Sequence, residues 1–558
     1  MIPARPSLRQ RPLALAVIAT TAICCALLIL PGATVTSAYF NDLLIFLDGG
    51  YRVVSGQVPN RDFHTALGPL AFYIPGVGYW LTRELGLAMP VGMSVLIVLI
   101  APVMTHVLGS RLRPVLAVPT AIFLLLLLAT PMNVGETIAN ISFAMYYNRI
   151  GWAMLGLLLV MHLRPARPAN RQGLLDAASA AILTLVLAYT KMTYGVVAVA
   201  FLLLTLLQPA QRAWSAAALV ICAVAAVAVE MVWGGTRMHI ADLALASQVS
   251  GVTQAATYLR SFLSTSGEYV LFAAIAATAL WRAPRMTDLL FYGFCICAGL
   301  ALVNQNFQIE GIVTLLAGAV VAAERLARHR RPGLSPAADL TTRAGPLVAV
   351  FLLLPIGLSS GAALGLHTIL AASGAGIPLD TPAGRDLRVA QTLDKGQFKF
   401  FRDYAESLES GAELLASLDT PPTQVLVFDF VSPFSALAGL EPPDGGTAWM
   451  HDGRNFDGEH YFSAEEVLGD VNLVMIPKRP IAGSTTELME ELYGDHLDRH
   501  FRLIRDTTLW RVLERRPPRS DPQVSSRSGG EPGPSPLTTF VAGRGQKTAG
   551  PQHSPNGA

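Results

Sequence analysis

Residues 37–76 read SAYFNDLLIFLDGGYRVVSGQVPNRDFHTALGPLAFYIPG and follow a long apolar run. Three carboxylates, Asp42, Asp48 and Asp62, lie within 21 of these residues. Acidic residues are otherwise scarce in this part of the chain, because only 13 of the 39 lie within residues 1–366. The stretch therefore marks both the point where the chain leaves an apolar environment and the place where chemistry is expected.

The composition is that of a membrane protein. Of the 558 residues, 52% are apolar and 14% are charged, and the mean hydropathy is +0.45. Soluble domains carry about 25% charged residues, so a soluble fold of this length would lack polar surface. The five cysteines lie in apolar runs and predict no disulfide framework. No basic stripe stands clear of a membrane flank, so no nucleic-acid partner is expected.

Apolar runs long enough to cross roughly 30 Å of hydrocarbon recur along the first two thirds of the chain. The predicted spans lie near 13–32, 88–108, 114–131, 149–163, 174–190, 194–208, 214–233, 267–281, 287–303, 309–323 and 345–366. They predict a polytopic α-helical membrane protein of about 11 transmembrane helices, with a small C-terminal α/β extracytoplasmic domain. The first run also fits a signal peptide, since VTSA at 35–38 resembles a cleavage site, but the further spans favour an uncleaved anchor.

Basic residues predict the orientation of these spans. With the N-terminus in the cytoplasm, the inside segments carry 16 basic residues, and the outside segments before the last span carry seven. An odd number of spans then places the chain from about residue 367 outside. The predicted location is the cytoplasmic (inner) membrane, crossed many times, with the N-terminus cytoplasmic and the C-terminal domain extracytoplasmic.

The chain divides into three predicted regions. They are a transmembrane domain at 1–366 with a first outer loop at 33–87, an extracytoplasmic α/β domain at 367–516, and a disordered tail at 517–558. Within the α/β domain we expect helices at 394–418 and 485–500, buried strands at 425–431 and 472–477, and closing strands at 501–506 and 508–516.

Asp42 is the strongest candidate for a catalytic residue. It comes just after the first span and should lie near the membrane surface. A carboxylate that is partly desolvated at such a boundary is a better base than one in free water. The alternative is that all three loop carboxylates are simply solvated.

The order of sequence features along this loop also resembles that of a known protein family. The features are Asp42, a helix-like stretch through Tyr51, Gly56, the run Pro59-Asn60-Arg61-Asp62-Phe63, and Gly68-Pro69-Leu70. The series resembles the first periplasmic loop of polytopic GT-C glycosyltransferases, the ArnT-like and PMT-like group that uses polyprenyl-phosphate sugars. In that group an acidic motif follows the first span, then a short helix, a G-x-x-P-Y-R-D-F-type turn and a PPL or GPL segment. Asn41 and Asn60 depart from the residues common at those places.

The resemblance implies a GT-C-like transmembrane domain and an inverting hexosyl- or pentosyltransferase. Asp42 would take the position of the catalytic acidic residue and accept the proton of the acceptor hydroxyl. A lipid phosphate leaves, and fixed positive charge near it is needed. Candidates for this charge are Arg149 in YYNRIGW (146–152), Lys191 in YTKMTYG (189–195), Arg237 and Arg260. Arg149 and Lys191 lie at membrane ends, where a charge is more often functional, although each could instead snorkel to headgroups.

Other residues are candidates for substrate contact. Asp48, Asp62 and His64 share the loop with Asp42, and Tyr194 lies close to Lys191 in the chain. One histidine and scattered carboxylates are weak grounds for a metal, so no metal or other cofactor is predicted, with a divalent cation left open. The expected partners are a polyprenyl-phosphate sugar donor, a lipid, glycan or protein acceptor, and the lipid bilayer.

Two other classes of function stay open. A polyprenyl-linked sugar flippase or transporter would need functional charges within spans and often shows inverted repeats, neither of which is prominent here. A non-catalytic relative that acts in envelope assembly is the other alternative, because fold resemblance alone does not establish activity.

Overall fold

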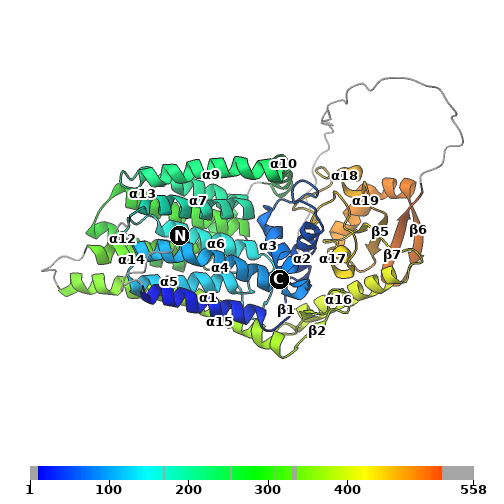
Figure 1. The fold of residues 1–558 in the computed structure, drawn as a ribbon, viewed down its shortest axis with the longest axis horizontal. Helices are drawn as coiled ribbons and strands as arrows, with labels where there is room; N and C mark the ends of the chain where they lie inside the picture. Colours follow the sequence, from blue (N-terminus) through cyan, green and yellow to red (C-terminus); the bar gives the residue numbers. More distant parts are fainter. Residues whose placement is uncertain are drawn as a thin grey trace, which may run out of the picture. The chain divides into compact units, whose positions relative to one another are not determined.

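The first two thirds of the chain are helical. A computed structural model describes residues 11–166, 170–251, 254–306, 308, 310–329 and 336–517. Its helices up to residue 372 are α1 (Arg11–Ile29), α2 (Phe40–Val54), α3 (Leu70–Thr82), α4 (Leu85–Arg111), α5 (Pro114–Ala129), α6 (Tyr146–Val160), α7 (Gln172–Thr190), α8 (Met192–Thr205), α9 (Arg212–Trp233), α10 (Thr236–Ser250), α11 (Ala255–Ser264), α12 (Ser266–Arg282), α13 (Met286–Asn306), α14 (Val313–Arg328) and α15 (Pro336–Ala372). Helices α4, α5, α6, α7 and α9 each contact the next in this series and run roughly side by side (Figure 1).

Each of the eleven predicted spans coincides with a helix, namely α1, α4–α9 and α12–α15. Within the described residues, α1, α4, α7, α9, α13 and α15 are long and apolar enough to cross a membrane, and the bent pair α11–α12, with 74° between its helices, gives a seventh. The chain is therefore a polytopic helical membrane protein. The number of eleven stays a prediction, because α5, α6, α8 and α14 have only 16, 15, 14 and 16 residues.

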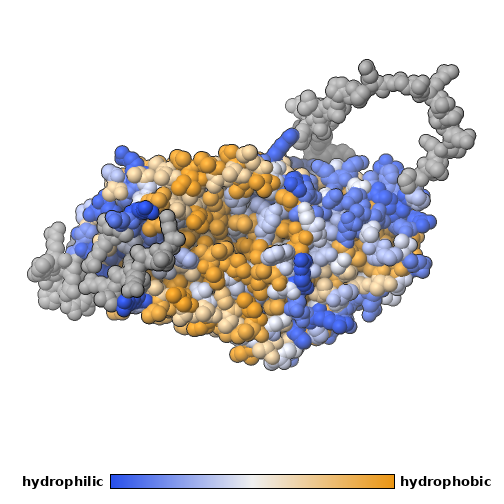
Figure 2. All heavy atoms as spheres, viewed as in Figure 1, coloured by the Kyte–Doolittle hydropathy of each residue, from blue (hydrophilic) through white to orange (hydrophobic). Residues whose placement is uncertain are grey.

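Apolar side chains cover the outside of the helical part. Leu99 in α4 and Val224 in α9 are 66% and 65% exposed, and Val232 near the end of α9 is 84% exposed. Figure 2 shows hydrophobic residues over these helices and hydrophilic residues over the C-terminal region. An apolar surface of this extent is unfavourable in water and is matched by lipid tails.

The predicted first outer loop is largely helical, with α2 and α3 joined by a turn. Gly56 takes φ +103° and Asn60 takes φ 59°, backbone conformations that suit these two residue types. Asp62 accepts a hydrogen bond from the Val58 backbone nitrogen at 2.7 Å and closes the turn. The G-x-x-P-N-R-D-F run thus reverses the chain between the two helices.

A small sheet joins this region to the chain after α15. Its strands are β1 (Thr34–Thr36), β2 (Ile377–Pro378) and β3 (Leu387–Val389), in the order β1-β3-β2. Strand β1 pairs parallel with β3, and β2 pairs antiparallel with β3. The residues just before Asp42 are therefore fixed by a segment about 350 positions later in the chain.

The C-terminal region is an α/β unit. Its elements are α16 (Lys395–Ala416), β4 (Val425–Val427), α17 (Phe434–Ala438), α18 (Ala464–Leu468), β5 (Leu473–Pro477), α19 (Gly483–His500), β6 (Phe501–Asp506) and β7 (Trp510–Arg515). The sheet order is β4-β5-β7-β6, parallel between β4 and β5 and antiparallel elsewhere. The predicted helices and strands of this region are all present.

Alternation along the strands explains why helices lie on both faces of this sheet. Val427 and Met475 belong to the core that includes residues of α16, and Val474 and Ile476 belong to a second core that includes residues of α19. The Trp510 indole nitrogen donates to the Ser407 carbonyl of α16 at 2.9 Å. The tail predicted from residue 517 lies outside the described residues, apart from Pro517.

Candidate active site

Asp42 lies in the first turn of α2. Helix α2 begins after Tyr39, which takes a left-handed conformation with φ 52° and ψ 41°. The segment before it is held by the Ser37 backbone nitrogen, which donates to the Ile141 carbonyl at 2.8 Å. Backbone N–H groups at a helix N-terminus favour a carboxylate, so this position suits an acidic residue.

The Asp42 carboxyl is desolvated but still accessible. The side chain is half-buried, and within the described residues its carboxylate has no hydrogen bond or ion pair. Solvent reaches part of it, yet the surrounding protein is dense enough that burial raises the pKa of Asp42 to about 7. A base whose pKa lies near the working pH can accept a proton and release it again.

Tyr147 lies close to this carboxyl, and Lys191 in turn contacts Tyr147. Burial raises the pKa of the Tyr147 hydroxyl, and the charge of Asp42 raises it further. The Asp42 and Tyr147 side chains therefore lie near each other. The Lys191 ammonium is 5.2 Å from the centroid of the Tyr147 ring and donates to Asn148 Oδ1 at 3.3 Å. Burial lowers the pKa of Lys191 to about 8. We call Asp42, Tyr147, Asn148 and Lys191 the Asp42 cluster.

The Gly68-Pro69-Leu70 turn helps to place Lys191. The Gly68 nitrogen donates to the Thr190 carbonyl at 3.2 Å, and a Cβ at Gly68 would lie 2.1 Å from the Tyr189 carbonyl oxygen. Only glycine allows this close approach. Lys191 itself is extended, with φ −155° and ψ 118°, between α7 and α8. The loop that carries Asp42 thus packs against the break that carries Lys191.

A second acidic group, Glu136, contacts Tyr39 just before Asp42 in the chain. The Tyr39 hydroxyl donates to Glu136 Oε1 at 2.8 Å, and Asn140 donates to Glu136 Oε2 at 3.0 Å. Burial raises the pKa of Tyr39, and the neighbouring Glu136 and Asp42 carboxylates raise it further. Glu136 is therefore held by hydrogen-bond donors, whereas the Asp42 carboxylate is left for another partner.

Arg149 is fully buried near the start of α6. Its Nη1 donates to the carbonyls of Met132 and Ala144 at 3.1 and 3.2 Å. Its Nε and Nη2 are buried with no hydrogen-bond partner among the described residues. The guanidinium is thus held by backbone on one side and keeps donor capacity on the other.

Asp48 and Tyr194 are engaged within the protein. Asp48 Oδ2 accepts from Arg52 Nε at 3.0 Å, and Arg52 Nη1 donates to the Pro443 carbonyl at 3.2 Å. Burial raises the pKa of Asp48, although the Arg52 guanidinium opposes the shift. The Tyr194 hydroxyl donates to the Asn148 backbone carbonyl at 3.3 Å, and its ring packs at 5.6 Å from Trp152.

Asp62 and His64 line a cavity of about 510 Å³ between the first loop and the C-terminal region. His64 Nδ1 lies 2.7 Å from Asp242 Oδ1, and Asp242 Oδ2 also accepts from the Thr65 nitrogen at 2.8 Å. The cavity includes Ser55 just after α2. At ~1.5 Å per residue, Ser55 is roughly 20 Å along the helix from Asp42, so the cavity is separate from the Asp42 cluster.

Several of these contacts were missed from the sequence. Arg52 stands four residues after Asp48, a spacing at which opposite charges meet on a helix, and could have been predicted as its partner. Tyr147 and Asp242 have no such local signal, because their partners come from distant segments. Within the described residues, no group of three or more His, Cys, Asp or Glu side chains is arranged to hold a metal ion, and we assign no cation ligands.

Comparison with known proteins gives a match in structure alone. No protein-family model matches the sequence, and no curated protein matches it. The crystal structure of ArnT from Cupriavidus metallidurans bound to undecaprenyl phosphate matches with a TM-score of 0.46 and 13% identity, over 91% of this chain and 99% of that one. The apo form of the same protein matches with a TM-score of 0.45 and 12% identity, over 89% and 97%. Over about nine-tenths of its length, the chain is thus similar to ArnT at low sequence identity.

Proposed function

We propose that this chain is a membrane glycosyltransferase of the GT-C type. It transfers a sugar from a polyprenyl-phosphate donor to a lipid, glycan or protein acceptor at the outer face of the cytoplasmic membrane. The observation that carries the proposal is Asp42, a half-buried carboxylate with a pKa of about 7 and no partner among the described residues. It lies in the loop that resembles the first periplasmic loop of that group.

Asp42 acts as the general base in this proposal. It accepts the proton of the acceptor hydroxyl while the hydroxyl oxygen forms a bond to the anomeric carbon. The bond from the anomeric carbon to the phosphate oxygen breaks, and its electron pair leaves with polyprenyl phosphate. Attack from the side opposite the leaving group inverts the anomeric configuration.

Lys191 stabilises the charge on the departing phosphate. Its ammonium is fixed by the Tyr147 ring and by Asn148, so its position is set before the substrate binds. Preorganised positive charge in a site that excludes water is worth far more than the same charge in water. Arg149, with two buried nitrogens that lack partners among the described residues, supports this part of the site from α6.

The remaining candidates are assigned to the acceptor. Asp62 and His64 line the cavity of about 510 Å³, and Asp242 fixes the orientation of the His64 ring. Because this cavity is roughly 20 Å from Asp42 along α2, it contacts a distant part of a large acceptor rather than the reacting hydroxyl. Asp48 and Tyr194 hold the surrounding helices in place.

The test is sugar transfer by the purified full chain. The donors are undecaprenyl-phosphate pentoses and hexoses, because undecaprenyl phosphate is the lipid in the solved ArnT complex. Release of polyprenyl phosphate is measured for the wild type, for Asp42→Asn and for Glu84→Gln, an exposed acid of the same predicted loop. We expect loss of release in Asp42→Asn alone. Full activity in that variant would contradict the assignment of the base, and movement of intact donor across vesicles without release would favour a flippase.

A further inference from the structure

A second polar site lies at the other ends of the helices that carry the Asp42 cluster. Helix α6 has Tyr147 in its first turn and leads to His162, and α8 begins next to Lys191 and leads to Gln208. At ~1.5 Å per residue, each of these helices separates the two ends by roughly 20 Å. The segments that meet here are connections that the basic residues predict to be cytoplasmic.

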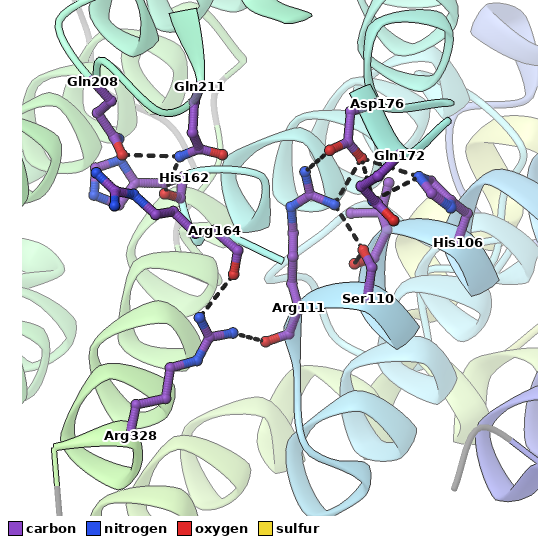
Figure 3. A network of polar contacts seen from close by, with 11 residues as sticks. His106, Ser110, Arg111, His162, Arg164, Gln172, Asp176, Gln208, Gln211 and Arg328 are labelled. Carbon is purple, nitrogen blue, oxygen red and sulfur yellow. Dashed lines mark hydrogen bonds and ion pairs between the residues drawn. The ribbon is translucent and has the colours of Figure 1, made fainter. Parts of the chain in front are cut away.

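The buried side chains of this site are joined in one network of hydrogen bonds. Arg325 Nε donates to Asp288 Oδ2 at 3.0 Å, and His162 Nε2 lies 3.0 Å from Asp288 Oδ1. Gln208 Nε2 lies 2.8 Å from the other ring nitrogen of His162, and Gln211 donates to the His162 carbonyl at 2.7 Å. Figure 3 shows His162 between the two glutamines. The Asp288 carboxylate is therefore already occupied on both oxygens.

Two more guanidiniums lie at this network without a counter-ion. Arg164 and Arg285 are exposed, and within the described residues neither side chain forms an ion pair or a hydrogen bond. Burial lowers the pKa of Arg285, and the charges of Arg325 and Arg164 lower it further, whereas the Asp288 carboxylate opposes the shift. The three cations therefore lie near one another. Like charges held together in this way repel unless an anion lies between them.

The three arginines line one cavity of about 170 Å³, together with Gln208, Thr287 and Asp288. The Asp288 oxygens face this cavity already bonded to Arg325 and His162. Guanidinium groups bind phosphate oxygens with two parallel hydrogen bonds, and the hydroxyl and amide supply further polar contacts. We propose that this cavity binds a phosphate group, from either an anionic membrane lipid or a soluble phosphate. Basic pockets between membrane helices are known to hold lipid headgroups, and the cavity lies at the helix ends where such headgroups occur.

The experiment compares two sources of phosphate on the purified full chain. Retention of phosphatidylglycerol against phosphatidylcholine is measured by native mass spectrometry, and the shift in thermal unfolding is measured with inorganic phosphate against chloride at equal ionic strength. The variant is Arg164→Gln with Arg285→Gln, both exposed, which leaves the Arg325–Asp288 ion pair intact. The control is Arg212→Gln, an exposed residue of a neighbouring predicted inside connection that does not line the cavity.

We expect the double variant to retain phosphatidylglycerol on the order of tenfold less than wild type and control. If instead only the effect of inorganic phosphate is lost, the site takes a soluble phosphate. Equal responses of the double variant, the control and the wild type to both ligands would overturn the proposal. None of these measurements uses sugar transfer, so the result is independent of the proposed enzyme activity.

Discussion

The Lys191 ammonium lies 5.2 Å from the centroid of the Tyr147 ring. A cation over an aromatic face is stabilised by roughly 0.5–2 kcal/mol, depending on how far it is desolvated. The hydrogen bond to Asn148 at 3.3 Å adds a second restraint from the same helix. The position of this positive charge is therefore set by α6, and not by the flexible lysine chain alone.

Replacement of Lys191 tests whether this charge acts on the leaving phosphate. We expect Lys191→Gln to lower kcat on the order of 100-fold, since a single preorganised donor contributes about this much. Lys191→Arg keeps the charge and should retain more activity. The exposed Arg83→Gln serves as control. If Lys191→Gln changed KM alone, the lysine would contribute to binding and not to the transition state.

The stability of Asp42→Asn should depend on pH. Because folding raises the pKa of Asp42 to about 7, the folded state favours the protonated carboxyl. Its contribution to stability is present below the unfolded pKa near 4 and is lost progressively as pH rises through about 7. Asparagine does not ionise, so the variant should be more stable than wild type by about 4 kcal/mol at pH 8 and nearly equal at pH 4. Thermal unfolding at both pH values measures this, and an unchanged difference would show that the carboxyl is not desolvated.

The pH profile of kcat/KM for transfer should have a rising limb and a falling limb. Asp42 must be ionised to accept a proton, so kcat/KM should rise as pH increases through about 7. Lys191 must be protonated, so kcat/KM should fall as pH increases through about 8. In Lys191→Arg the upper limb should move to higher pH, because a guanidinium stays protonated. An upper limb that does not move in that variant belongs to another group.

The Asp48–Arg52 ion pair predicts a large structural effect. Both side chains are buried, and Arg52→Ala leaves Asp48 as a buried charge with no counter-ion, which costs about 3–5 kcal/mol. It also removes the hydrogen bond from α2 to the Pro443 carbonyl. Arg61→Ala, which breaks the more exposed pair with Asp62, should cost less than about 1 kcal/mol. Denaturant unfolding of the two variants gives the comparison, and equal losses would mean that burial of the pair has no consequence.

Much of the fold could be predicted because its signals are local. Apolar runs predicted the long helices α1, α4, α7, α9, α13 and α15, since a helix in lipid satisfies its own backbone hydrogen bonds. A short apolar run predicted β5 at 473–477 as a buried strand, and β7 at 510–515 was predicted as a closing strand. The pairing of β1 with β3 had no such signal, because strands of three residues that lie about 350 positions apart carry too short a pattern to be matched from the sequence.

The candidate site could be predicted only in part for the same reason. The position of Asp42 after the first apolar run is local, and so is the presence of Lys191 between two runs. The approach of Asp42 to Tyr147 depends on how α2 packs against α6, and the pairing of His64 with Asp242 joins residues 178 positions apart. Neither relation follows from the spacing of residues along the chain.

The pairing of β1 with β3 also sets the order in which the protein can be completed. The segment 34–36 leaves the ribosome early, but its partner at 387–389 is synthesised about 350 residues later. At roughly 5–20 residues per second, that partner emerges some 20 to 70 s afterwards. During this interval α1 can already be inserted in the bilayer, while the strand leading to Asp42 has no sheet to join. The segment that leads to the proposed base therefore has no sheet partner until residue 389 of the 558 has been synthesised.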